Sequence, residues 1–136
     1  SIRKNLLEFC RKLVVKNISF VNTDYKKFKL DSLTSNDFCY FDPPYYLGDA
    51  SYNENDGWNE KKEKELLEYL NEVDKHGIKF ALSNVTEHKG LKNEMLINWA
   101  IENQYNIHNL NYNYSNSNYH LKNKNQVTKE VLITNY

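Results

Sequence analysis

The segment Asp37–Tyr46, DFCYFDPPYY, places a carboxylate, two prolines and two tyrosines directly after an apolar run. The run Phe38–Phe41 has the composition of a buried β-strand. Ligands of an open α/β sheet bind beyond the carboxyl ends of its strands. Asp42, which follows the run, is therefore expected at the ligand-binding edge of a sheet.

Two prolines restrict the backbone next to Asp42. Pro43 and Pro44 fix their φ angles and lack backbone donors, so the chain leaves the strand on a rigid path. The carbonyls of Asp42 and Pro43 then remain as acceptors beside the carboxylate, and Tyr45 offers an aromatic face on the same stiff backbone. This set predicts a site that binds a planar NH₂ group and stacks on its ring. The alternative is a simple strand-ending turn with a capping aspartate.

Strands and helices alternate along the chain. Apolar residues at helical spacing predict a helix over Ile2–Val14, a second from Glu60 to its stop at His76, and a third over Leu91–Asn103. The alternation predicts an α/β fold with a mostly parallel sheet of about five strands, in which the last two strands form a closing antiparallel hairpin. The expected strands are Ile18–Val21, Phe38–Phe41, Ile78–Ser83, Tyr105–Leu110 and Glu130–Thr134.

The composition is that of one globular domain, with 136 residues of which 40% are hydrophobic. The 18 basic and 18 acidic residues cancel. The chain therefore lacks the positive charge that is usual when a domain binds the nucleic-acid backbone by itself. The four histidines show no metal-ligand spacing, so no metal is expected.

The two cysteines and the hydropathy pattern indicate a compartment. Cys10 and Cys39 lie in apolar stretches and are expected to be free, buried thiols of a reducing environment. No apolar stretch has the length of a membrane span, and the first residues lack a signal pattern. The chain is therefore expected to be cytoplasmic, without contact to a membrane.

Asp-Pro-Pro-Tyr after an apolar strand resembles the catalytic motif of amino-group DNA methyltransferases of the adenine-specific branch. Three further segments are similar to the Dam-like DNA adenine methylases of restriction-modification systems, and the resemblance covers essentially the whole chain. These segments are Ile18–Phe28, GIKFALSNVTEHKGLKN at residues 77–93, and EVLITNY at residues 130–136.

The resemblance implies methyl transfer from S-adenosylmethionine to the 6-amino group of a flipped adenine in duplex DNA. The Asp42 carboxylate and the Pro43 carbonyl would accept hydrogen bonds from that amine, and Tyr45 would stack on the base. The implied catalytic residues are Asp42, Pro43, Pro44 and Tyr45.

The resemblance also implies residues beside the catalytic motif. Asp24 and Tyr25, with Asp42, would contact the cofactor, although the first two also suit a surface turn. Ser83 and Asn84 are expected to end the next strand on the side of Asp42 and to support the pocket, although they also suit a plain turn. The expected substrate-binding residues, some in a long polar loop that could equally be solubilising, are Tyr46, Tyr52, Asn53, Trp58, Ser83 and Asn84.

Three features of the relatives are missing from the sequence. These are the Gly-rich loop near the methionine part of the cofactor, the acid that binds its ribose, and the insert that reads the DNA sequence. Residues 1–136 are therefore expected to form a partial catalytic domain, the C-terminal portion of a Rossmann-like methyltransferase sheet. Phe38–Phe41 would then have an exposed edge, which favours a homo-oligomer. The alternatives are an inactive remnant or binding module, and a methyltransferase for another planar amine, in RNA or protein glutamine.

Overall fold

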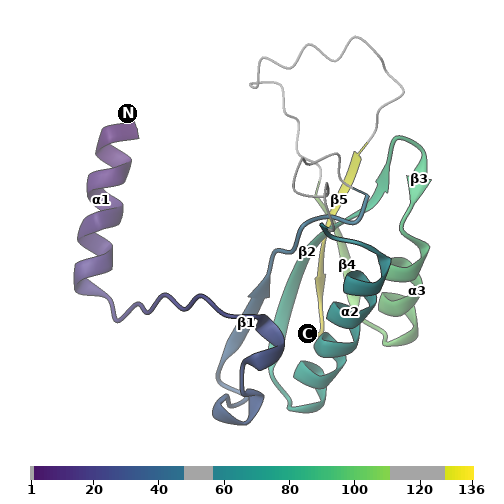
Figure 1. Cartoon of the computed structure of the whole chain (residues 1–136), viewed down its shortest axis with the longest axis horizontal. Coiled ribbons are helices and arrows are strands. Elements are labelled where there is room, and N and C mark those ends of the chain that lie inside the picture. Colours follow the sequence, from purple (N-terminus) through teal and green to yellow (C-terminus); the bar gives the residue numbers. More distant parts are fainter. Residues whose placement is uncertain (1, 48–56, 111–127) are drawn as a thin grey trace.

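A mixed β-sheet forms the centre of the protein (Figure 1). The computed structural model describes residues 2–47, 57–110 and 128–136. The strands lie in the order β1-β2-β5-β4, and the short β3 pairs with β2 beside this path. Their bounds are Phe38–Phe41 for β1, Lys79–His88 for β2, Leu91–Lys92 for β3, Asn106–Leu110 for β4 and Thr128–Thr134 for β5.

The strand directions differ from the expected ones. Strand β1 runs parallel to β2, with Phe41 opposite Leu82. Strand β2 pairs antiparallel with β3 and β5, and β4 pairs antiparallel with β5. The antiparallel closing hairpin is confirmed, but the expectation of a mostly parallel sheet is wrong for the described strands. The reason is that β2 has an antiparallel neighbour, β5, on the side away from β1.

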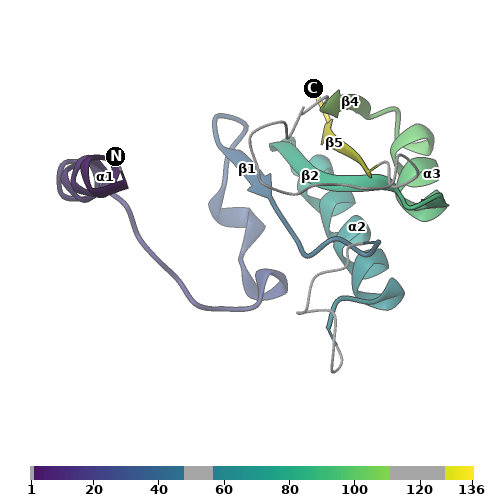
Figure 2. The same cartoon turned by 90° about the horizontal axis from the view of Figure 1, so that it is seen from above.

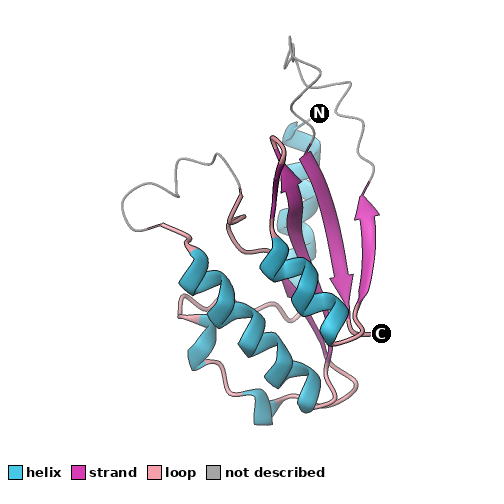
Figure 3. Cartoon of the chain, turned by 90° about the vertical axis from the view of Figure 1, so that its right-hand side faces the viewer, coloured by secondary structure: helices cyan, strands magenta, loops and turns pink. Residues whose placement is uncertain are grey.

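Two helices cover one face of the sheet (Figure 3). Helix α2 is Glu60–Lys75 and helix α3 is Glu94–Glu102. The Asn59 side chain caps α2 by accepting a hydrogen bond from the Lys62 backbone N–H at 3.0 Å. The apolar faces of both helices pack on β2 and β5. The buried cluster contains Leu66, Leu67, Leu70, Val73, Ile78, Phe80, Leu82, Leu96, Trp99, Ala100, Val131 and Ile133.

The N-terminal part of the chain leaves most of its large apolar side chains exposed. Helix α1, Ile2–Val15, forms as its spacing predicts, but none of its residues is buried, and it stands apart from the sheet (Figure 2). The expected strand Ile18–Val21 is wrong, and Phe20 is 81% exposed. A strand needs a neighbouring backbone to pair with, and no described strand lies beside this segment. Cys10 is exposed for the same lack of a packing partner, whereas Cys39 is half-buried.

Strand β2 is longer than the sequence pattern predicts. It continues past Ser83 to His88, because β5 supplies pairing partners along this stretch. A tight turn with positive φ at Lys89 (51°) and Gly90 (81°) then leads into β3. The expected helix start at Leu91 is therefore wrong. Helix α3 begins at Glu94, after Asn93 has capped it by accepting from the Leu96 N–H at 3.1 Å.

Candidate functional site

The chain leaves β1 through the Asp-Pro-Pro-Tyr motif. Asp42 is exposed, whereas Pro43, Pro44 and Tyr45 are half-buried, and the four residues line a pocket of about 340 Å³. Among the described residues, no turn or loop hydrogen bond between backbone groups uses the carbonyl of Asp42 or Pro43. Three acceptor groups, one carboxylate and two carbonyls, therefore lie together at the carboxyl end of a parallel strand.

Ser83 on β2 holds the tyrosine of this motif. The hydroxyl groups of Tyr45 and Ser83 lie 3.0 Å apart, and Ser83 is 9% exposed. The parallel pairing of Phe41 with Leu82 brings β2 to this position. Burial raises the pKa of Tyr45, the hydrogen bond with Ser83 lowers this pKa in part, and the charge of Asp42 raises it. The phenol is therefore neutral at physiological pH. Ser83 contacts a residue that lines the pocket, and its expected role in substrate binding stays a prediction.

Asn84 lies on the other side of β2 from Ser83. Successive residues of a strand point to opposite faces of the sheet. The Asn84 side chain is fully buried on the helix side and donates a hydrogen bond to the Glu63 carboxylate at 3.0 Å. The expectation that Asn84 ends the strand and faces the side of Asp42 is therefore wrong, because β2 continues through it.

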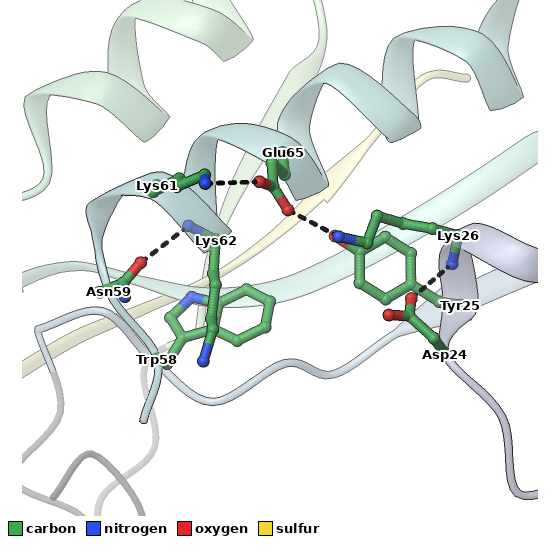
Figure 4. A pocket seen from close by; sticks show the side chains of 8 residues that line it. All are labelled: Asp24, Tyr25, Lys26, Trp58, Asn59, Lys61, Lys62 and Glu65. Carbon is green, nitrogen blue, oxygen red and sulfur yellow. Dashed lines mark hydrogen bonds and ion pairs between the residues drawn. The ribbon is translucent and has the colours of Figure 1, made fainter. Parts of the chain in front are cut away.

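A second pocket, of about 560 Å³, lies between the segment before α2 and the short 3₁₀ helix Tyr25–Lys27 (Figure 4). Asp24 caps this short helix by accepting from the Lys26 N–H at 2.9 Å. The Lys26 ammonium group reaches across to the Glu65 carboxylate at 2.7 Å. The pocket is lined by Asp24, Tyr25, Lys26, Trp58, Asn59, Lys61, Lys62 and Glu65.

Aromatic rings from distant parts of the chain form walls of this second pocket. Tyr25 packs edge-on against Tyr69 of α2, with ring centroids 5.1 Å apart, and burial raises the pKa of Tyr25. Trp58 lines the same pocket. The structure thus groups Trp58 with Asp24 and Tyr25, whereas the sequence places Trp58 among the substrate-binding residues.

Three expected substrate residues remain, of which the structure describes Tyr46. Tyr46 follows Tyr45, is half-buried, and lines neither pocket. Tyr52 and Asn53 lie outside the described residues. Their expected roles stay predictions.

Glu63 is a residue of this region that the sequence reasoning missed. It is fully buried and accepts hydrogen bonds from three side chains, including Trp58 and Asn84. Its place in the sequence held a signal, because Glu63 precedes Leu66 and Leu67 by three and four residues and so falls on the apolar stripe of the helix.

In the described ranges 2–47, 57–110 and 128–136, no group of three or more His, Cys, Asp or Glu side chains could hold a metal ion. No helix of these ranges is both long enough and apolar enough to cross a membrane.

The acceptor cluster lies at the carboxyl end of a parallel strand, where α/β proteins bind their ligands, and its oxygens suit the N–H groups of a planar amine. The comparison with protein families identifies the class. The chain belongs to the D12 class of N6 adenine-specific DNA methyltransferases, whose family model matches residues 2–116. The resemblance inferred from Asp-Pro-Pro-Tyr and its accompanying segments is thereby confirmed.

Three curated relatives are named as modification methylases or as a type II methyltransferase. The chain is 44% identical over 140 residues to the modification methylase StsI of Streptococcus sanguinis. It is 41% identical over 140 residues to the type II methyltransferase M.FokI of Planomicrobium okeanokoites. Each of these matches covers 100% of this chain and 21% of the relative. The modification methylase LlaI of Lactococcus lactis subsp. lactis is 39% identical over 101 residues, which cover 71% of this chain and 15% of the relative. The chain thus spans about a fifth of the length of the StsI and FokI methylases.

Proposed function

We propose that this chain contributes the target-amine site of an enzyme that methylates the 6-amino group of adenine in duplex DNA, as part of a restriction-modification system. The observation that supports this most directly is the exposed Asp42 carboxylate beside two backbone carbonyls that no described loop hydrogen bond uses. Membership of the D12 class supports adenine as the base that carries the amine. The base has to leave the duplex to reach this pocket.

The residues of the motif have separate tasks in this proposal. The lone pair of an adenine amine is delocalised into the ring, so the nitrogen is a poor nucleophile. The Asp42 carboxylate and the Pro43 carbonyl accept one N–H each and stabilise the positive charge that develops on the nitrogen during transfer. The methylated nitrogen then releases a proton, for which the Asp42 carboxylate is a nearby acceptor. Tyr45 stacks on the base, and its hydroxyl stays bound to Ser83.

The methyl group requires a donor, which for methyltransferases is in general S-adenosylmethionine. Bound S-adenosylmethionine supplies an activated methyl group on a sulfonium centre. The second pocket fits a nucleoside of this kind, because its volume of about 560 Å³ lies in the usual range for ligand sites. Tyr25 and Trp58 provide aromatic faces for an adenine ring, and the exposed Asp24 carboxylate provides an acceptor for its amine. The resemblance assigns Asp42 to this cofactor too, but Asp42 lines the other pocket.

Methylation assays on the protein at its native length test this function. Asp42→Asn is expected to lower kcat by at least about a hundredfold, because the amide turns one acceptor into a donor toward the amine. Glu68→Gln is the matched control, since Glu68 is an exposed acid on α2 with a side chain that is 65% exposed. Retention of full activity by Asp42→Asn would refute the catalytic assignment.

The choice of substrate is tested in the same assay. Duplex DNA that contains adenine is expected to accept the methyl group, and the product is N6-methyladenine. RNA with the same sequence and a glutamine-containing peptide are the comparison substrates. Methylation of either one in place of the duplex would overturn the proposed substrate, and binding of the duplex without any transfer would indicate a binding module.

A further inference from the structure

The Glu63 carboxylate is fully buried and is surrounded by N–H donors. Its Oε2 atom accepts from the Trp58 indole Nε1 at 2.6 Å. Its Oε1 atom accepts from the Asn84 Nδ2 at 3.0 Å and from the Asn93 Nδ2 at 3.1 Å. A carboxylate is an acceptor at both oxygens, so it satisfies all three donors at once.

The three donors belong to three separate parts of the fold. Trp58 lies in the segment before α2 and lines the second pocket, Asn84 lies on β2, and Asn93 is the N-cap of α3. A buried carboxylate costs free energy that apolar side chains at the same position would avoid. The carboxylate at position 63 is therefore better explained by the three side chains that it orients than by a contribution to the stability of the core.

The wall of the second pocket is fixed by further bonds near Glu63. The Lys62 ammonium group donates to the Gly57 carbonyl at 2.7 Å, and the Lys62 N–H donates to the Asn59 side chain at 3.0 Å. Trp58 lies between Gly57 and Asn59 in the sequence, and both of these residues are bonded to Lys62. The Trp58 indole has one polar atom, which is a donor only. The bond to Glu63 therefore sets the orientation of the ring within a segment that is already held at both sides.

We propose that Glu63 is a positioning residue of the cofactor pocket: it holds the Trp58 indole in the orientation in which the ring forms a wall for the adenine of S-adenosylmethionine. This inference rests on the proposed function, which assigns the second pocket to the methyl donor. Glu63 itself lines neither pocket and acts through Trp58. Trp58 accordingly contacts the cofactor and not the target base.

The two asparagines determine what happens when the carboxylate becomes an amide. The Asn84 Oδ1 accepts from the Val85 N–H at 2.7 Å, and the Asn93 Oδ1 accepts from the Leu96 N–H at 3.1 Å. Neither side chain can rotate by half a turn without losing that bond, so both continue to present N–H groups. A glutamine at position 63 therefore keeps its oxygen toward the asparagines and turns its NH₂ group toward the Trp58 N–H, where two donors meet.

The experiment compares the wild-type protein at its native length with Glu63→Gln. The indole ¹H–¹⁵N resonance of Trp58, assigned with Trp58→Phe, is expected to move in Glu63→Gln. Trp99 is the internal control, because its indole N–H donates to Asn71 Oδ1 at 2.8 Å, away from this network. An unmoved Trp58 resonance, or an equal shift of the Trp99 resonance, overturns the positioning role.

Calorimetric titration with S-adenosylmethionine gives the functional measurement. Glu63→Gln is expected to raise the Kd for the cofactor about tenfold, which is the usual scale for one charge-assisted hydrogen bond, with kcat at saturating cofactor nearly unchanged. An unchanged Kd, or a lower kcat at unchanged Kd, refutes the proposal. Absence of heat with the wild-type protein instead refutes the proposed function, while the indole resonance still reports on the bond between Glu63 and Trp58.

Trp58→Phe keeps the test decisive if Glu63→Gln does not fold. This variant retains an aromatic ring and removes only the bond to Glu63 and part of the ring area. It is expected to raise the Kd for S-adenosylmethionine as well, and Glu63→Gln added to it is expected to cause little further change. A full additional loss in the double variant would show that Glu63 acts independently of Trp58.

Discussion

The hydrogen bond between Tyr45 and Ser83 allows a quantitative test of how the catalytic motif is held. The two hydroxyl groups lie 3.0 Å apart, but their surroundings differ, because Ser83 is 9% exposed and Tyr45 is half-buried. Tyr45→Phe leaves the nearly buried Ser83 hydroxyl without this partner. Ser83→Ala leaves a tyrosine hydroxyl that is closer to water.

The asymmetry predicts different costs for the two variants. A buried hydroxyl that loses its partner costs about 1–3 kcal/mol, whereas a neutral hydrogen bond contributes about 1 kcal/mol net. We expect Tyr45→Phe to lower the free energy of unfolding by about 1.5 kcal/mol and Ser83→Ala by about 0.5 kcal/mol. The double variant is expected to lose about 1 kcal/mol, which leaves a coupling energy of about 1 kcal/mol.

Urea unfolding of the wild-type protein and the three variants gives this cycle directly. Methylation kinetics give a second readout, because Tyr45→Phe keeps the ring that stacks on the base and Tyr45→Ala removes it. Loss of aromatic stacking costs about 1–3 kcal/mol per base, so kcat/KM should fall about tenfold more for the alanine variant than for the phenylalanine variant. A larger stability loss for Ser83→Ala than for Tyr45→Phe, or strictly additive losses, would refute the reasoning.

Two further predictions concern the helix that covers the sheet. Leu70→Ala, on the buried face of α2, is expected to lower the free energy of unfolding in urea by about 3 kcal/mol. Glu68→Ala, on the exposed face of the same helix, should change this free energy by less than about 0.5 kcal/mol. Similar losses in the two variants would contradict the assigned packing. The Glu72 backbone carbonyl and then the Asp31 carboxylate raise the pKa of His76 above its ordinary 6.5. This group therefore stabilises the fold fully below pH 6.5 and loses that contribution as the pH rises through its raised pKa. The urea midpoint should therefore fall as the pH rises above 6.5, and it should fall less in His76→Gln.

Local patterns predicted the elements whose stabilising contacts are close in sequence. The stripe from Leu66 to Val73 and the cap at Asn59 correctly placed α2, because helical spacing and N-capping operate within one or two turns. The apolar run Phe38–Phe41 and the stop at Asp42 correctly placed the end of β1. The edge position of β1 is also confirmed for the described strands, and Tyr40 is 59% exposed, whereas the expected homo-oligomer stays a prediction.

The expectations that failed needed information about distant partners. Ile18–Val21 has the composition of a strand, but no described strand pairs with it. Strand β2 extends beyond its expected end at Ser83, because β5 pairs with it as far as His88. Both outcomes depend on backbone groups far along the chain, whose hydrogen bonds no local pattern can report.

The sequence by itself determined the acceptor cluster at Asp42–Tyr45, because a strand followed by two prolines fixes the backbone within a few residues. Only the tertiary structure decided which face of the sheet the neighbouring side chains Ser83 and Asn84 occupy. Pairing of β1 with β2 brought Ser83 to Tyr45, and the pleat of β2 sent Asn84 to the opposite face. Packing of α2 on that face buried Glu63, and the Trp58 indole donates a hydrogen bond to its carboxylate. A buried carboxylate needs hydrogen-bond donors, and these come from remote segments, so only the tertiary structure could bring them together.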